Sequence, residues 1–193
     1  MEQSQHNIMV TQNITNRYDI RIMRDIDGPE YFAEELSAIA SAQQGDEIHL
    51  HLCTDGGSIH TALMLRKALM QTPAHTRAHI GPNCCSAGTV LALSCDEWEI
   101  DEFSTFMIHA ATFGIFGKHN EVKGQYEFKE KWLSKVFDSV YTGFMSEEEI
   151  QQILAGKDFW FTADELNERL SYYAEYRKAL HEAEALDSSA EQD

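Results

Sequence analysis

The chain has 193 residues, of which 43% are hydrophobic and 24% charged, as expected for a globular domain with one hydrophobic core. Acidic side chains outnumber basic ones by 32 to 15, which gives a net charge of −17 at pH 7. A charge of this sign repels phosphate groups and anionic lipids, so we expect neither nucleic acid nor membranes as partners.

The N-terminal residues and the cysteines indicate the cellular compartment. Residues 1–19 lack the basic start and apolar stretch of a signal peptide, and no run of about eighteen apolar residues occurs. The cysteines lie in segments typical of core strands and helices, without the spacing of a disulfide framework. We therefore expect a soluble cytoplasmic protein with four free thiols: Cys53, Cys84, Cys85 and Cys95.

The first part of the chain predicts a strand, a glycine turn and two helices. Residues 28–45 have an apolar face at helical spacing. Residues 46–53 alternate apolar and polar side chains, which is typical of a strand, and residues 54–57 contain two adjacent glycines. Residues 58–71 then form an apolar helical segment that a proline ends.

The same order of elements is repeated further along the chain. Residues 76–81 indicate a short strand, and residues 86–95 are small and apolar enough for a buried helix. Two further short strands are predicted at 97–100 and 105–110. This alternation favours an α/β layered fold with a largely parallel sheet, in which active sites lie at the carboxyl ends of strands.

The second half of the chain is predicted to be mainly helical. A glycine-punctuated aromatic segment, residues 112–124, precedes a long helix at about 125–144. Capping-box patterns at 146–149 and 162–165 open two more helices, and residues 185–193 are expected to be a disordered acidic tail. The last helix carries an apolar stripe for packing against this subunit or a neighbour: Leu166, Leu170, Tyr173, Tyr176 and Leu180.

Three polar residues lie at predicted element ends, where a hydrolytic site can form. Ser86 opens a helix after a strand, His109 follows another strand, and Asp158 lies between two helices. A serine attacks an amide only with a base, a group that orients the base, and N–H donors for the oxyanion. Taken singly, however, such a serine is more often a helix N-cap and such an aspartate a turn residue.

Four segments together are more specific than any single residue. In order and spacing, residues 55–58, 81–88, 106–109 and 156–163 resemble the successive signatures of the Clp protease proteolytic subunit. The serine and the histidine are 23 residues apart, and the histidine and the aspartate 49, which is similar to the separations in that family. The resemblance covers about residues 19–168.

The resemblance implies a role for each residue that matches a family signature. Ser86 is the expected nucleophile, His109 the general base and later the acid, and Asp158 the carboxylate that orients the histidine. The backbone N–H groups of Gly57 and Ala87 are the expected oxyanion hole. No cofactor and no metal ion are implied.

The resemblance also implies a fold and an assembly. The family has the α/β spiral of strand–turn–helix units that enoyl-CoA hydratases (crotonases) share, with a protruding helical handle at about 112–144. We divide the chain into an N-terminal segment (1–18), a Clp-like domain (19–168) and a C-terminal acidic helix and tail (169–193). A homo-oligomer, expected as two stacked rings, encloses the active sites, polypeptides are the substrates, and an AAA+ unfoldase is a candidate partner.

Two positions depart from the family pattern near the expected substrate contacts, which are Gly56, Ala110 and Thr112. Residues 54–55 are Thr-Asp where the family usually has serine-proline, so the turn must be held differently. Residues 110–111 are Ala-Ala where the family usually has glutamine-proline, which changes the strand that binds substrate.

Three alternatives remain open beside a cellular peptidase. A virus-type maturation protease acting on scaffold and capsid proteins would use the same triad. A crotonase-type acyl-CoA enzyme would use the glycine-turn N–H groups on a thioester oxygen and would not need the triad. An inactive family member would serve only as a structural ring partner.

Other reactive side chains are assigned structural roles. Cys85 directly precedes the serine, yet it fits a small packing residue better than a nucleophile. No C-x₂-C or H-E-x-x-H spacing indicates a zinc site. His49 and His51 alternate with apolar residues and are expected on the polar face of a strand.

Overall fold

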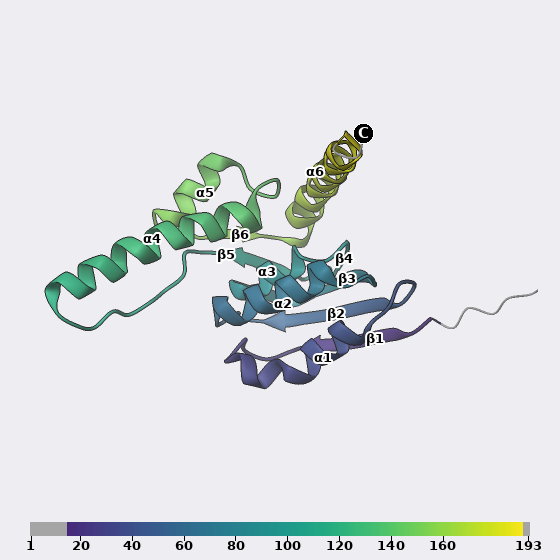
Figure 1. Cartoon of the computed structure of the whole chain (residues 1–193), viewed down its shortest axis with the longest axis horizontal. Helices are drawn as coiled ribbons and strands as arrows, with labels where there is room; N and C mark the ends of the chain where they lie inside the picture. Colours follow the sequence, from purple (N-terminus) through teal and green to yellow (C-terminus); the bar gives the residue numbers. More distant parts are fainter. Residues whose placement is uncertain (1–14, 191–193) are drawn as a thin grey trace, which may run out of the picture.

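The computed structural model describes residues 15–190. Within them the chain forms one sheet, with helices around it (Figure 1). In chain order the elements are β1 (Arg17–Ile22), η1 (Pro29–Phe32), α1 (Ala33–Ser41), β2 (Glu47–Thr54), α2 (Ile59–Gln71), β3 (His75–Cys85), α3 (Ala87–Ala92), β4 (Glu97–Ile100), β5 (Thr105–Ile108), α4 (His119–Tyr141), α5 (Glu147–Leu154), β6 (Phe159–Phe161) and α6 (Ala163–Ala190).

The sheet is mostly parallel, as the alternation of strands and helices predicts. Its order is β1-β2-β3-β5-β6, and β4 pairs with β3 beside β5. Every pairing is parallel except that of β5 with β6, which is antiparallel. Parallel neighbours need long crossovers, and the helices supply them.

The core lies between the sheet and the helices that cross over it. Ile48, Leu50 and Leu52 of β2 are buried. They form one cluster with Leu65 of α2 and Leu91 of α3. Each such side chain contributes about 1.5–3 kcal/mol of hydrophobic stabilisation. The period-two pattern of β2 therefore fixes which face of the sheet meets the helices.

The opposite face of the strands is polar and rich in histidine. The ring of His79 stacks on His51 at 4.4 Å and on His49 at 5.0 Å between centroids. His49 and His51 lie on this face as predicted, although His49 is only 5% exposed because of the stacking. Burial lowers the pKa of His79, while a hydrogen bond from His49 lowers the pKa of Glu47.

Two strands differ from the sequence prediction. β1 was not predicted, although Tyr18, Ile20 and Ile22 alternate with charged residues as an edge strand does. β3 runs on to Cys85, well past the predicted end at residue 81, because the register of β2 and β3 shifts and accommodates Pro82.

Helix α4 projects from the body as the expected handle (Figure 1). It begins six residues before the predicted start at 125, because the Glu121 carboxylate accepts a hydrogen bond from the Lys118 N–H at the helix start. Gly124 had suggested a loop there. The other end of α4 is anchored by buried Leu133 and Phe137.

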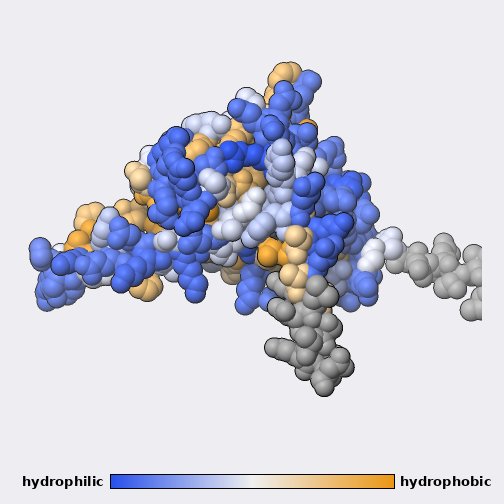
Figure 2. All heavy atoms as spheres, turned by 90° about the horizontal axis from the view of Figure 1, so that it is seen from above, coloured by the Kyte–Doolittle hydropathy of each residue, from blue (hydrophilic) through white to orange (hydrophobic). Residues whose placement is uncertain are grey.

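Hydrophobic side chains on this arm are exposed. In Figure 2 they gather on the projection at the left, among hydrophilic surface. The exposed fractions are 94% for Phe116, 68% for Phe128 and 51% for Tyr126. The chain thus presents an exposed apolar surface on this projection, which is typical of an interaction surface.

Both predicted capping boxes are present. The Ser146 N–H donates to Glu149 Oε2 at 2.9 Å, and the Glu149 N–H donates to Ser146 Oγ at 3.2 Å. The Thr162 N–H donates to Glu165 Oε2 at 2.8 Å.

Helix α6 is longer and more regular than expected. It continues to Ala190, so the prediction of a disordered tail is wrong for residues 185–190, and residues 191–193 lie outside the described part. Ala185, Leu186 and Ala190 favour a helix in this stretch. The division proposed at residue 168 falls inside this helix. No helix in residues 15–190 is both long and apolar enough to cross a membrane.

The pair of Glu149 and Arg169 joins α5 to α6. The guanidinium donates to both carboxylate oxygens, at 2.5 and 3.0 Å, and to the Phe144 carbonyl oxygen at 3.1 Å. Hydrogen bonds from Arg169 hold the pKa of Glu149 below its ordinary value. The stabilisation is therefore present above the unfolded-state pKa of about 4.3 and is lost as the pH falls toward the lower folded-state pKa.

We predict that Arg169→Ala lowers the free energy of unfolding by about 1.5–3 kcal/mol at pH 7, because it leaves a half-buried carboxylate without its partner. Urea unfolding at pH 7 and at pH 3 measures this loss, which should shrink at the lower pH. Lys123→Ala is the control, because Lys123 meets Glu127 only at 3.8 Å on the exposed handle and should cost about 0–0.5 kcal/mol. Equal losses for the two variants would contradict the prediction.

Candidate active site

Ser86 occupies a strained turn between a strand and a helix. It separates β3 from α3 and has φ 52° and ψ −121°. Within residues 15–190 it is the only non-glycine residue with positive φ. Its N–H donates to the Met107 carbonyl oxygen at 2.8 Å, which holds the turn against β5. Such strain, of about 1–3 kcal/mol, marks functional positions, and α/β hydrolases expose a nucleophilic serine on a turn of this kind.

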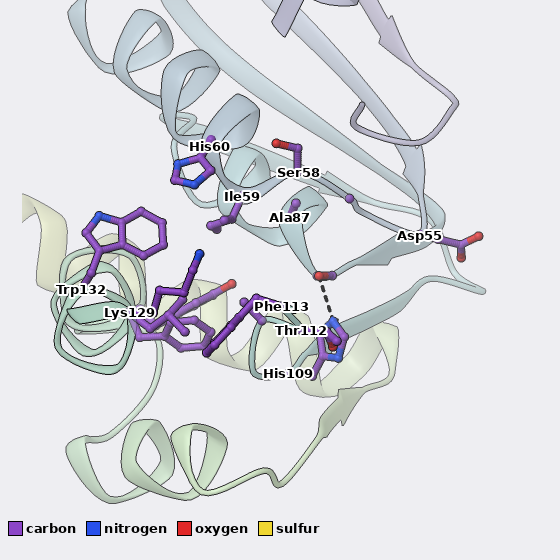
Figure 3. A pocket seen from close by; sticks show the side chains of 16 residues that line it. Asp55, Ser58, Ile59, His60, Ala87, His109, Thr112, Phe113, Lys129 and Trp132 are labelled. Carbon is purple, nitrogen blue, oxygen red and sulfur yellow. Dashed lines mark hydrogen bonds between the residues drawn. The ribbon is translucent and has the colours of Figure 1, made fainter. Parts of the chain in front are cut away.

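His109 is the first residue after β5, next to this turn. Because β5 pairs in parallel with the end of β3, the carboxyl ends of the two strands meet. The Nε2 atom of His109 lies 2.9 Å from Ser86 Oγ (Figure 3). With Nε2 unprotonated, the serine hydroxyl donates to it, which is the geometry of a general base and its nucleophile.

Asp158 is placed opposite His109 by strand register but does not contact it. Ile108 pairs with Phe159 at the last rung of the antiparallel ladder, so the next rung would pair His109 with Asp158. Asp158 is exposed, and no hydrogen bond joins it to His109 among the described residues. The structure thus brings Ser86 and His109 into contact. It places Asp158 just beyond the last β5–β6 pair, without contact to His109.

The glycine turn after β2 packs directly against Ser86. A Cβ on Gly56, at φ +101°, would lie 2.6 Å from Ser86 Cβ and 2.9 Å from the Ala87 nitrogen. A Cβ on Gly57, at φ +138°, would collide with the Ile26 carbonyl oxygen. Only glycine permits this approach at both positions.

Two backbone donors meet at this contact. The N–H groups of Gly57 and Ala87 have no acceptor among the described residues, and both residues line the pocket in front of Ser86. They are therefore available to an incoming oxygen, as the sequence prediction of an oxyanion hole requires.

Asp55 shows how the turn is held without the usual proline. Its Oδ1 accepts a hydrogen bond from Asn83 Nδ2 at 2.5 Å, which ties the turn to the end of β3. Asn83 Oδ1 in turn accepts from the Cys85 thiol at 3.0 Å. Burial, and next the Asp55 charge, raise the pKa of Cys85, so its thiol stays protonated and is a poor nucleophile.

A second contact ties the serine turn to the handle. The Thr89 hydroxyl donates to the Ser86 carbonyl oxygen at 2.7 Å and lies 2.8 Å from the Tyr141 hydroxyl. Since the threonine proton is used, the tyrosine is the donor in the second bond. Burial raises the pKa of Tyr141, so it remains a donor, and the anchored end of α4 is coupled to the turn.

A pocket of about 470 Å³ opens beside Ser86 and His109. Of the three predicted substrate contacts, only Thr112 lines it; Gly56 is buried beneath the serine and Ala110 packs against the core. Its wall also includes residues that the sequence analysis missed, because nothing in the sequence shows that α4 folds back against α2: His60, Lys129, Trp132, Leu133 and Phe137.

The fold and this site define an α/β protein with a serine–histidine pair at the carboxyl ends of parallel strands. A family model described as Clp protease matches residues 2–169, so the chain belongs to the Clp protease family. Membership supports a ClpP-type peptidase.

Similar proteins occur among solved structures and among curated sequences. A mutant of ClpP1 from Listeria monocytogenes has the same fold, with a TM-score of 0.60 and 18% identity, over 78% of this chain and 86% of that one. The likeness confirms the predicted fold class. An uncharacterized protein of Methanocaldococcus jannaschii is 38% identical over 69 residues, which are 36% of this chain and 24% of that protein. The chain thus covers about a quarter of that relative's length.

We predict that Gly56→Ala lowers the free energy of unfolding by about 2 kcal/mol or more, because the new Cβ has no space beside Ser86 and φ is positive. Gly124→Ala is the matched control. Its Cβ meets nothing within 4 Å, and it should raise stability by about 0.5–1 kcal/mol, since alanine favours a helix. Thermal and urea unfolding measure both; a neutral Gly56→Ala would show that the turn is looser than described.

Proposed function

We propose that this chain is a serine endopeptidase of the Clp proteolytic-subunit type, with Ser86 as nucleophile, His109 as general base and Asp158 as the orienting carboxylate. The observation that carries the proposal is the 2.9 Å separation of Ser86 Oγ and His109 Nε2 on a strained strand–helix turn. Family membership supports the reaction class.

The arrangement supports each step of acyl transfer. His109 removes the Ser86 proton as the oxygen attacks the peptide carbonyl, and the Gly57 and Ala87 N–H groups receive the oxyanion. His109 then gives the proton to the leaving amine. Water, activated by the same imidazole, hydrolyses the acyl-enzyme and releases the new carboxyl end.

Asp158 has the third role in this proposal. Its side chain is exposed at the start of β6, so rotation about its own bonds can bring the carboxylate toward His109 Nδ1. Residues directly opposite on antiparallel strands have Cβ atoms about 4.5–5.5 Å apart, within reach of such a hydrogen bond. The bond would hold the tautomer in which Nε2 accepts the serine proton.

Assembly is also proposed. The exposed aromatic side chains of the handle, Phe116 and Phe128, support a homo-oligomer formed through this arm and enclosing the active sites, as expected for stacked rings. An AAA+ unfoldase that feeds polypeptides into the chamber is the proposed partner.

The alternatives differ in what they require of the site. An acyl-CoA enzyme has no need of the Ser86–His109 pair, and an inactive ring partner has no need of its geometry. A capsid or scaffold maturation protease uses the same chemistry on another substrate. The peptidase chemistry is therefore the first point to test.

We predict that a fluorophosphonate probe adds once to the wild-type protein and not to Ser86→Ala, since only a base-activated serine reacts. Intact-mass analysis counts the adducts. Ser58→Ala is the matched control, because Ser58 lines the same pocket without a histidine partner and its removal should leave the adduct in place. An adduct that persists in Ser86→Ala, or its absence from folded wild-type protein, would overturn the proposal.

We predict that Asp158→Asn lowers kcat for peptide hydrolysis by about 10⁴-fold, the loss expected when the orienting carboxylate of a triad becomes an amide. Steady-state kinetics of the assembled protein measure it. Asp164→Asn tests a nearby exposed carboxylate of α6 and should leave kcat within about twofold. Equal activity of the two variants would return Asp158 to the role of a turn residue.

A further inference from the structure

The pocket beside Ser86 has two chemically different ends. Ser86 and His109 lie at one end, and Lys129, Trp132 and His60 lie together at the other (Figure 3). The rings of His60 and Trp132 are 4.9 Å apart between centroids, so α2 and α4 meet there. A side chain that enters from the serine therefore reaches a surface made by both helices.

Lys129 brings a positive charge into this wall. It is half-buried, and its Nζ lies 5.1 Å from the centroid of the Phe113 ring. Among residues 15–190 no carboxylate forms an ion pair with it. This pocket therefore carries a positive charge without an acidic partner, although the chain as a whole has a net charge of −17.

The one carboxylate that lines the same pocket is already engaged. Asp55 accepts a hydrogen bond from Asn83 at 2.5 Å and lies at the far end from Lys129 (Figure 3). Asp55 therefore does not pair with the ammonium group of Lys129, which stays accessible to a ligand. An ammonium group that is already partly removed from water is stabilised by an opposite charge within hydrogen-bond reach.

The rest of the wall is apolar and suits the carbon part of a side chain. Ile59, Leu133, Phe137 and the ring of Phe113 line the same pocket as the serine and the lysine. The pocket thus combines an apolar wall with a positive charge that lies away from His109 (Figure 3), which matches methylene groups followed by a carboxylate.

Resting on the proposed peptidase function, we propose that Lys129 makes this pocket selective for an acidic side chain on the residue whose carbonyl Ser86 attacks. The ammonium group pairs with the substrate carboxylate, and the aromatic wall covers the methylene groups. Glutamate fits better than aspartate, because its longer side chain extends further from the serine. Lys129 acts on specificity and takes no part in proton transfer.

The test compares peptides that differ only at that residue: glutamate, glutamine, leucine and lysine. For the wild-type protein we expect kcat/KM for glutamate to exceed that for glutamine by about 10- to 100-fold, the value of one charge-assisted contact. Lys129→Met should remove this preference, so that the ratio of kcat/KM for the glutamate and glutamine peptides falls to about one, and Lys129→Glu should favour the lysine peptide.

Lys131→Met is the matched control. Lys131 is exposed, two residues further along α4, and is not part of the pocket wall, so its loss should leave the glutamate preference unchanged. An equal effect of both substitutions would show that only general charge matters. A wild-type enzyme that cleaves glutamine or leucine peptides as well as glutamate overturns the inference.

Fluorophosphonate labelling of the same samples separates this inference from the proposed function. If wild-type Ser86 labels and the glutamate preference is absent, selectivity by Lys129 is wrong and the peptidase stands. If folded wild-type protein neither labels nor cleaves any of the four peptides, the peptidase itself fails, and the inference with it.

Discussion

Strand β3 pairs with β2 on one side and with β5 on the other, and the site depends on this shared strand. Its parallel pairing with β5 puts Cys85 beside Met107, so Ser86, one residue further on, and His109, two residues further on, lie at adjacent strand ends. Its pairing with β2 brings the glycine turn so close that a Cβ on Gly56 would meet Ser86. The proposed nucleophile, the proposed base and the N–H donors thus come from three loops that one strand aligns.

Local patterns in the sequence predicted most elements of this arrangement. The alternation in β2 and the two capping boxes are properties of a few adjacent residues, and the structure has them. The start of α4 was misplaced because Gly124 opposes a helix locally, while the Glu121 cap outweighs it. β1 was missed because an edge strand of alternating charged residues has little apolar signal.

Only part of the candidate site could be predicted from the sequence. The roles of Ser86 and His109 came from resemblance and spacing, and their contact agrees with that prediction. The pocket wall was not predictable, because Lys129 and Trp132 reach it only when α4 folds back on α2. The position of Asp158 depends on the register of β6, which no pattern in the three residues of that strand specifies.

The handle helix α4, together with α5, lies in the stretch of chain between His109 and Asp158, because both helices lie between β5 and β6. It is thus an insertion whose two ends hold two members of the proposed triad, and Tyr141 links it to the serine turn as well. The chain path therefore ties the separation of imidazole and carboxylate to how this inserted segment packs. In the proposed mechanism, assembly through α4 would therefore act on the triad through the two ends of this insertion.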